Sequence, residues 1–241
     1  MSANLLADQV AIVTGAGRGI GRAVVTALAA EGAAVVLAAR TRAELAAAAS
    51  DIRETGNRTL IVPTDITQEQ AVFALMDQAV AEFGRVDVLV NAAGVASFSP
   101  VAAAKIDDWD AMHAVNLRGV MLCCQAVLPV MMRQQRGTII NIGSVAATRP
   151  IAGAAAYAAT KAGVLAFSRV LAEELRPSSV RVSVVMPGAV DTPLWDAISA
   201  GPDRARMLRP ADVARTVLLA ATLPPGASLE ELTVLPAGGV L

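Results

Sequence analysis

The chain has 241 residues, a formal net charge of −1, 55% hydrophobic residues and 17% charged residues. This length suits a single domain, and the apolar fraction supplies a large core. The near-neutral charge, without a run of basic residues, argues against nucleic acid or an anionic membrane as a partner. No cationic amino-terminal stretch precedes an apolar segment, and no apolar run reaches the roughly 20 residues of a membrane span, so we expect a cytoplasmic protein.

Short apolar runs alternate with helical patterns along the chain. The expected strands are residues 10–13, 34–38, 59–62, 86–90, 138–142, 180–185 and 232–235. The expected helices are residues 20–31, 42–55, 68–83, 107–134, 157–176 and 210–222. Alternation of this kind is typical of crossover connections between parallel strands. We therefore predict an α/β fold, a single doubly wound parallel sheet of about seven strands with helices on both faces, over residues 1–241.

The first expected strand is followed at once by a glycine-rich turn. Gly15, Gly19 and Gly21 lie between Val13 and the apolar stripe of the next helix. Glycines allow the backbone to turn tightly and to approach a pyrophosphate, and the amino terminus of a helix attracts that anion. This context predicts a dinucleotide site.

The second expected strand ends at Ala39-Arg40, where an NAD enzyme usually carries Asp or Glu. No acid stands there, and Arg18 lies in the glycine-rich turn. An arginine can bind the 2′-phosphate of NADP through paired hydrogen bonds, whereas a carboxylate would repel that phosphate. We therefore predict NADP(H) as the cofactor, with Arg40 and Arg18 on the 2′-phosphate.

Tyr157 and Lys161 stand four residues apart, downstream of Ser144. On a helix this spacing puts the two side chains on one face. A nearby ammonium favours the phenolate, so we expect Lys161 to lower the pKa of Tyr157. The hydroxyl of Ser144 would then hold a substrate oxygen against the phenol, which is an arrangement for moving a proton on or off an alcohol or carbonyl.

Six motifs follow one another in an order that occurs in a known enzyme family. They are Thr14-Gly15-x-x-x-Gly19-x-Gly21, Asp65-Ile66, Asn91-Ala92-Ala93-Gly94, Asn116, Ser144 with Tyr157-x-x-x-Lys161, and Pro187-Gly188-x-Val190-x-Thr192. In this order they resemble the short-chain dehydrogenase/reductase family, over about residues 10–192. The resemblance implies a Rossmann fold, a nicotinamide cofactor and oxidation or reduction of CH–OH and C=O groups.

The resemblance also implies a role for each motif. The catalytic residues would be Asn116, Ser144, Tyr157 and Lys161, with Asn116 positioning a water that connects Lys161 to solvent. With the two arginines included, the residues expected to bind the cofactor are Gly15, Arg18, Gly19, Ile20, Gly21, Arg40, Asp65, Ile66, Asn91, Ala92, Gly94, Tyr157, Lys161, Pro187, Gly188, Val190 and Thr192.

The residues that flank these motifs are mostly small and apolar, which favours an apolar small-molecule carbonyl compound or its alcohol. They are Val95, Ala96, Val145, Ala146, Ile151, Ala189, Leu194 and Trp195. Residues of about 194–210 are expected to form a substrate lid. One alternative is a 3-oxoacyl-carrier-protein reductase, with Arg133, Arg136 and Arg169 binding the acidic carrier. A second alternative is a non-catalytic NADPH-binding sensor.

Two further predictions concern metals and assembly. Cys123 and Cys124 are expected to be small buried hydrophobes, and the lone His113 does not suggest a metal site. The helical stretches 120–132 and 154–167 are apolar on more than one face. Because one face can pack on the sheet and the other needs a partner, we expect a homodimer or homotetramer.

Overall fold

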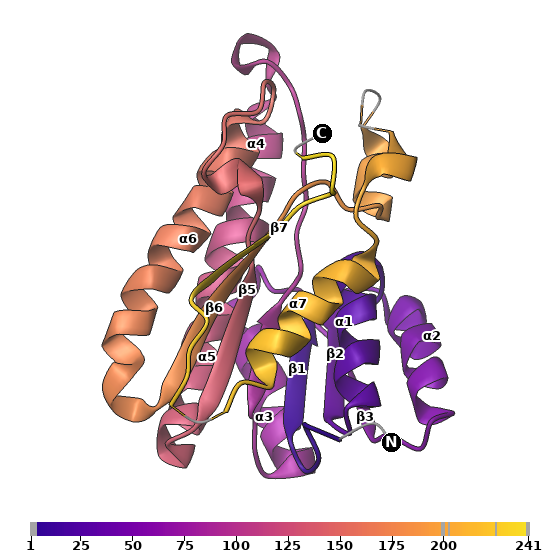
Figure 1. Cartoon of the computed structure of the whole chain (residues 1–241), viewed down its shortest axis with the longest axis vertical. Helices are drawn as coiled ribbons and strands as arrows, with labels where there is room; N and C mark the ends of the chain where they lie inside the picture. Colours follow the sequence, from indigo (N-terminus) through magenta and orange to yellow (C-terminus); the bar gives the residue numbers. More distant parts are fainter. Residues whose placement is uncertain (1–3, 199–200, 202, 225, 240–241) are drawn as a thin grey trace.

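Seven parallel strands form a sheet in the order β3-β2-β1-β4-β5-β6-β7 in the computed structural model, which describes residues 4–198, 201, 203–224 and 226–239 (Figure 1). The strands are β1 (Val10–Thr14), β2 (Ala34–Ala39), β3 (Thr59–Pro63), β4 (Val88–Asn91), β5 (Gly137–Ile142), β6 (Val180–Pro187) and β7 (Glu231–Val234). The predicted α/β fold is confirmed. Strand order reverses between β1 and β4, so the loops that follow these two strands diverge and open a crevice.

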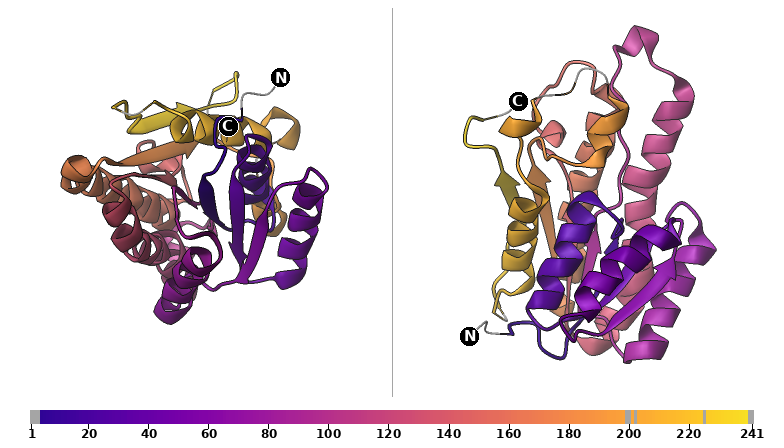
Figure 2. Two further views of the ribbon diagram at one scale, coloured as in Figure 1. Left: turned by 90° about the horizontal axis from the view of Figure 1, so that it is seen from below. Right: turned by 90° about the vertical axis from the view of Figure 1, so that its right-hand side faces the viewer.

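Helices cover both faces of the sheet (Figures 1 and 2). One buried cluster joins the sheet to α1 (Gly19–Ala30), α2 (Arg42–Arg53) and α7 (Pro210–Ala221). The other joins it to α3 (Glu69–Phe83), α5 (Gly119–Gln134) and α6 (Ala155–Leu175). Since every residue of β1, β4 and β5 is buried, these strands read as continuous apolar runs rather than as alternating ones.

The helix expected over residues 107–134 is a continuous helical run with an irregular centre. It comprises α4 (Ile106–Met112), a π-helical segment (His113–Arg118) and α5. By length and composition the run 106–134 would be able to span a membrane, but 56% of its most apolar window is buried within the molecule. Cys123 and Cys124 are fully buried there. This burial is that of a core helix, because α5 packs against the sheet and α3.

The carboxyl ends of the strands carry the loops that matter for function. The loop after β4 and helix α4 rise beyond this edge of the sheet, and the segment after β6 lies opposite them (Figure 2). The predicted lid of about residues 194–210 begins in this segment. Its residues 199, 200 and 202 lie outside the described residues.

Candidate active site

A cleft of about 1340 Å³ runs along the carboxyl ends of the strands. It is lined by the loops that follow β1, β2, β3, β4, β5 and β6 and by the start of α6. All of the predicted site residues line this cleft except two, Asn91 and Asn116. Of the expected substrate-side residues, only Ala146 does not line it. The cleft is large enough for a dinucleotide together with a small molecule.

The glycine-rich turn leads from β1 into α1 and packs against the loop after β4. Gly15 has a φ of +68°, and a Cβ at this position would lie 2.8 Å from the Cα of Ala93. A Cβ on Gly21 would overlap the carbonyl oxygen of Gly15. The buried Thr14 hydroxyl accepts hydrogen bonds from the amides of Ala92 (3.2 Å) and Ala93 (3.3 Å). The turn therefore places bare backbone and the amino terminus of α1 at the cleft, which fits a pyrophosphate.

One end of the cleft lies where β2 and β3 end, and it carries two arginines and two acids. The exposed side chains of Arg18 and Arg40 both line it. Asp65 lies beside them. A hydrogen bond from the Thr67 amide lowers the pKa of Asp65, and the Thr67 hydroxyl and the charge of Arg40 act in the same direction. Glu44, on the first turn of α2, also lines this end and lies against Gly17.

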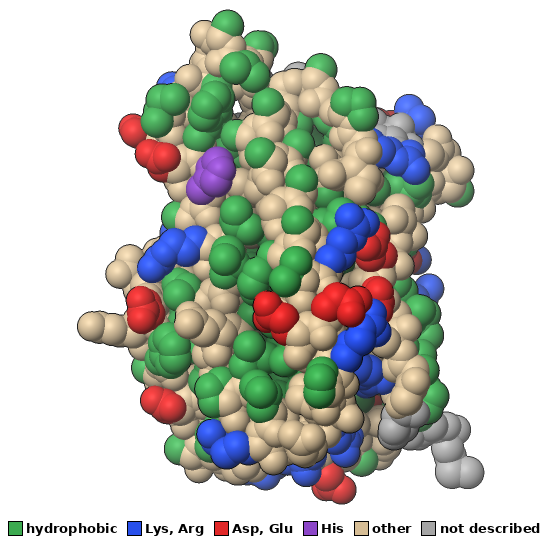
Figure 3. All heavy atoms as spheres, turned by 90° about the vertical axis from the view of Figure 1, so that its left-hand side faces the viewer, with side chains coloured by type: hydrophobic (Ala, Val, Ile, Leu, Met, Phe, Trp, Pro, Cys, Tyr) green, Lys and Arg blue, Asp and Glu red, His purple; other side chains and the backbone are tan. Residues whose placement is uncertain are grey.

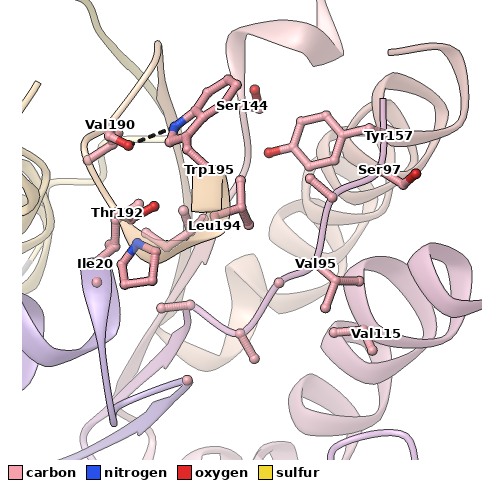
Figure 4. A pocket seen from close by; sticks show the side chains of 18 of the residues that line it. Ile20, Val95, Ser97, Val115, Ser144, Tyr157, Val190, Thr192, Leu194 and Trp195 are labelled. Atoms are coloured by element: carbon pink, nitrogen blue, oxygen red, sulfur yellow. Dashed lines mark hydrogen bonds between the residues drawn. The ribbon is translucent and has the colours of Figure 1, made fainter. Parts of the chain in front are cut away.

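Ser144, Tyr157 and Lys161 meet at the other end of the cleft, where β5 ends and α6 begins. The ammonium of Lys161 is 5.8 Å from the ring centroid of Tyr157, and it donates a hydrogen bond of 2.8 Å to the carbonyl of Ile142. Burial lowers the pKa of Lys161 to about 8. The phenol oxygen of Tyr157 points toward Ser144 and the indole of Trp195 (Figure 4).

The expected lowering of the Tyr157 pKa is wrong for this arrangement. Burial raises the pKa of the phenol, and the neighbouring Ser144 hydroxyl offsets only part of this effect. The physical reason is that the Lys161 ammonium is directed at the carbonyl of Ile142, while the ring around the hydroxyl is shielded from water. Tyr157 is therefore protonated at neutral pH, and Lys161 is mostly charged.

Asn116 lies in the π-helical segment and is fully buried beside the cleft. Its side-chain amide accepts from the amide of Val95 (2.9 Å) and donates to the carbonyl of Val95 (2.8 Å). A Cβ on Gly94 would lie 3.5 Å from its oxygen and 3.9 Å from the Lys161 ammonium. Asn116 thus holds the loop after β4 close to Lys161.

Asn91 lies beneath the cleft, at the end of β4. Its side chain donates to the Asn141 oxygen at 2.9 Å, and Asn141 donates to the Ser168 hydroxyl at 2.8 Å. All three side chains are buried. Asn91 therefore ties β4 to β5 and α6, and it supports the cleft from below.

The segment after β6 closes the remaining side of the cleft. Pro187, Gly188, Val190 and Thr192 line it, and Thr192 approaches Gly19, where a Cβ would lie 3.2 Å from the threonine methyl group. The loops that follow β1 and β6 therefore meet across the cleft.

Several lining residues were not predicted as site residues. Phe98 stacks on Trp195, while Ser97 donates a hydrogen bond of 2.9 Å to Asp108 at the start of α4. Glu44 was missed as well. The sequence alone does not give their positions, because these depend on how the loops fold over the cleft. Phe98 could have been suspected, since it is one of four phenylalanines in the chain and closely follows the Asn91–Gly94 motif.

The chain is similar to known proteins over most of its length. A family model for short chain dehydrogenases matches residues 9–203. The chain belongs to the short-chain dehydrogenase family. As a member of this family it is an oxidoreductase. An uncharacterized oxidoreductase from Staphylococcus aureus (strain N315) is 38% identical to it, over 96% of this chain and 99% of that protein.

Two solved structures resemble this short-chain dehydrogenase over nearly its full length. A metagenomic short-chain oxidoreductase in complex with NADP is 39% identical, with a TM-score of 0.85 over 97% of this chain and 99% of that chain. An alcohol dehydrogenase from the archaeon Thermococcus sibiricus, complexed with 5-hydroxy-NADP, is 31% identical, with a TM-score of 0.88 over 95% and 97% of the two chains.

Proposed function

We propose that this oxidoreductase uses NADP(H) to reduce a ketone or aldehyde on an apolar small molecule to the alcohol, or catalyses the reverse reaction. The observation that carries the proposal is the meeting of Ser144, Tyr157 and Lys161 at one end of a cleft whose other end holds Arg18 and Arg40. The NADP complexes of two similar structures support the choice of cofactor.

The cleft offers a partner for each part of the cofactor. The glycine-rich turn and the amino terminus of α1 would hold the pyrophosphate. Arg40 and Arg18 would hold the 2′-phosphate, with Asp65 and Ile66 at the adenine. The loop from Pro187 to Thr192 would hold the nicotinamide end.

The protein residues supply the proton and the position of the substrate. When bound, NADPH supplies a hydride to the carbonyl carbon. Ser144 and Tyr157 donate hydrogen bonds to the carbonyl oxygen, and Tyr157 then gives its proton to that oxygen as the C–H bond forms. The Ser144 hydroxyl, which partly offsets the raised pKa of Tyr157, stabilises the phenolate that remains, and that phenolate takes up a proton from solvent. One ketone, one NADPH and one proton thus yield one alcohol and one NADP⁺.

Replacement of Tyr157 by Phe tests this proposal directly. The variant keeps the ring and the other cofactor-binding residues, so NADPH binding, measured by its fluorescence, should be largely retained. The proton donor is lost, and turnover of ketones should fall by roughly 10²- to 10⁴-fold. Retention of wild-type turnover in Tyr157→Phe would exclude Tyr157 as the proton donor.

The carrier-protein alternative gains no support from Arg136 and Arg169, two of the three arginines that would bind the carrier. Arg169 pairs with Glu231 at 2.6 Å, and Arg136 lies 3.9 Å from the carboxylate of Asp87. Each of these positive charges thus has a negative one beside it. The sensor alternative is disfavoured because Ser144, Tyr157 and Lys161 are all in place.

We also propose that the protein forms a homo-oligomer through α5 and α6. Hydrophobic side chains gather between charged groups on the face that carries these helices (Figure 3). Met121 and Met132 of α5 and Val170 of α6 are 42%, 46% and 59% exposed. Exposed apolar groups on neighbouring helices are typical of a subunit contact.

A further inference from the structure

An aromatic cluster stands beside the phenol of Tyr157. The chain holds four Phe, two Trp and one Tyr, and three of these seven residues meet in the cleft. The ring of Phe98 packs edge-on against Tyr157 (5.7 Å between centroids, 67° between planes) and stacks nearly parallel on Trp195 (5.7 Å, 20°). A chain so poor in aromatic residues thus concentrates them where the substrate would lie.

The cluster joins segments that are far apart in the sequence. Phe98 lies in the loop after β4, Tyr157 on α6 and Trp195 in the short helix of residues 193–197. The indole nitrogen of Trp195 donates a hydrogen bond of 3.0 Å to the carbonyl of Val190, which fixes the orientation of the indole (Figure 4). Phe98 and Trp195 are both half-buried and both line the cleft, so part of each ring is accessible from it.

Each end of the cleft carries charges of both signs. Among the described lining residues, the two arginines and two of the acids stand at the end around Arg40. The aromatic end carries one cation, Lys161, whose ammonium is directed at the carbonyl of Ile142, and one acid, Asp108, which Ser97 approaches at 2.9 Å. Asp108 lines the cleft on the side of Ser97, so a substrate carboxylate that reached this side would meet a like charge.

We propose that Phe98 and Trp195 form an aromatic wall that selects uncharged carbonyl compounds with an aryl ring next to the carbonyl. This inference rests on the proposed carbonyl reduction. The phenol of Tyr157 points toward the indole, so a carbonyl bound to Tyr157 places a substituent beside the wall (Figure 4). A flat ring continues the stack of Phe98 on Trp195, whereas a saturated ring of similar size, with hydrogens on both faces, cannot approach as closely.

The first experiment compares acetophenone with cyclohexyl methyl ketone. The ratio of their kcat/KM values is measured with NADPH in the wild type and in Trp195→Leu and Phe98→Leu. Comparing ratios between variants cancels the different intrinsic reactivity of the two ketones. We expect the ratio to fall about threefold to tenfold in each Leu variant, as is typical of a lost aromatic stack. Trp195→Phe keeps a flat ring and should retain most of the ratio.

Phe73→Leu is the matched control, because Phe73 lies on α3, is 38% exposed and does not line the cleft. Its ratio should equal that of the wild type. NADPH binding, measured by fluorescence, verifies that each variant is folded. Ketone reduction with an unchanged ratio in both cleft variants would overturn the aromatic wall but leave the proposed function intact. If no ketone or aldehyde consumed NADPH and no corresponding alcohol reduced NADP⁺, the proposed function itself would be overturned.

The second experiment tests the charge at this end of the cleft. Turnover of 4-acetylbenzoate is compared with that of its uncharged methyl ester in the wild type and in Asp108→Asn. We expect the acid-to-ester ratio to rise at least threefold in Asp108→Asn, because a like charge has been removed. An unchanged ratio would show that Asp108 does not act on the substrate and would overturn the selection against acids.

Discussion

The buried ammonium of Lys161 has an electrostatic cost that can be measured. Burial lowers its pKa from 10.5 to about 8. This difference of about 2.5 corresponds to roughly 3 kcal/mol of differential stabilisation. Because the folded-state pKa lies below the unfolded one, the unfolded chain binds more protons between pH 8 and 10.5. The free energy of unfolding therefore rises as the pH rises through this window.

Replacing Lys161 by Met should stabilise the protein at pH 7 while abolishing turnover. The variant removes a cost of roughly 3 kcal/mol for burying the charge and loses about 1 kcal/mol from the hydrogen bond to Ile142. We therefore expect its free energy of unfolding to be higher by about 2 kcal/mol. Urea denaturation at pH 7 and pH 10 measures it, and the gain should shrink at pH 10. Lys105, which is exposed and is the other lysine of the chain, provides the control Lys105→Met. A gain that does not change with pH would contradict the low pKa of Lys161.

At the scale of elements, the junction of β2 with α2 carries two arginines, Arg40 and Arg42, which lie two positions apart in the sequence. Arg40 follows β2 and lines the cleft, whereas Arg42 is the first residue of α2 and does not line it. Both side chains are exposed. The two positions therefore form a matched pair that differs in access to the cofactor.

Arg40→Ala should raise KM for NADPH about tenfold or more and leave KM for NADH nearly unchanged, because a hydrogen bond to a charged group contributes about 1.5–3 kcal/mol. Arg42→Ala should change neither value. Steady-state kinetics with both cofactors measures the effect. Equal changes for NADPH and NADH in Arg40→Ala would mean that Arg40 does not bind the 2′-phosphate.

At the scale of the whole molecule, the apolar face over α5 and α6 predicts the mass in solution. Light scattering should give a multiple of the chain mass for the wild type. Val170→Glu places a charge on that face and should shift the mass toward a single chain. Leu5→Glu is the control, since Leu5 is 54% exposed and lies outside these helices. A wild-type mass equal to one chain would contradict the proposed oligomer.

Much of the fold follows from local sequence patterns. Each expected strand overlaps an observed one. Strands such as β1, β4 and β5 are buried along their whole length, and strands of this kind appear as apolar runs whatever their neighbours are. The expected site residues come together because most of them follow a strand, and the carboxyl ends of parallel strands share one edge of the sheet. The boundaries are less accurate; β4 was expected to begin at Val86 and begins at Val88.

Features that depend on contacts between distant segments could not be predicted. The stack of Phe98 on Trp195 joins loops after different strands. The direction of the Tyr157 pKa depends on where the Lys161 ammonium points, and the four-residue spacing leaves that open. The π-helical segment around Asn116 could not be predicted either, because the residues before and after it have the sequence pattern of an ordinary helix.

The close approach of Gly15 to Ala93 has a consequence for how this sequence can diverge. A Cβ at Gly15 would occupy space that the backbone of Ala93 already fills, although 78 residues separate Thr14 from the amide of Ala92 that it binds. Any side chain at Gly15 would push the two loops apart and widen the crevice from within. Because the obstruction is backbone, no substitution at Ala93 would relieve it, and random mutagenesis should recover glycine alone at position 15.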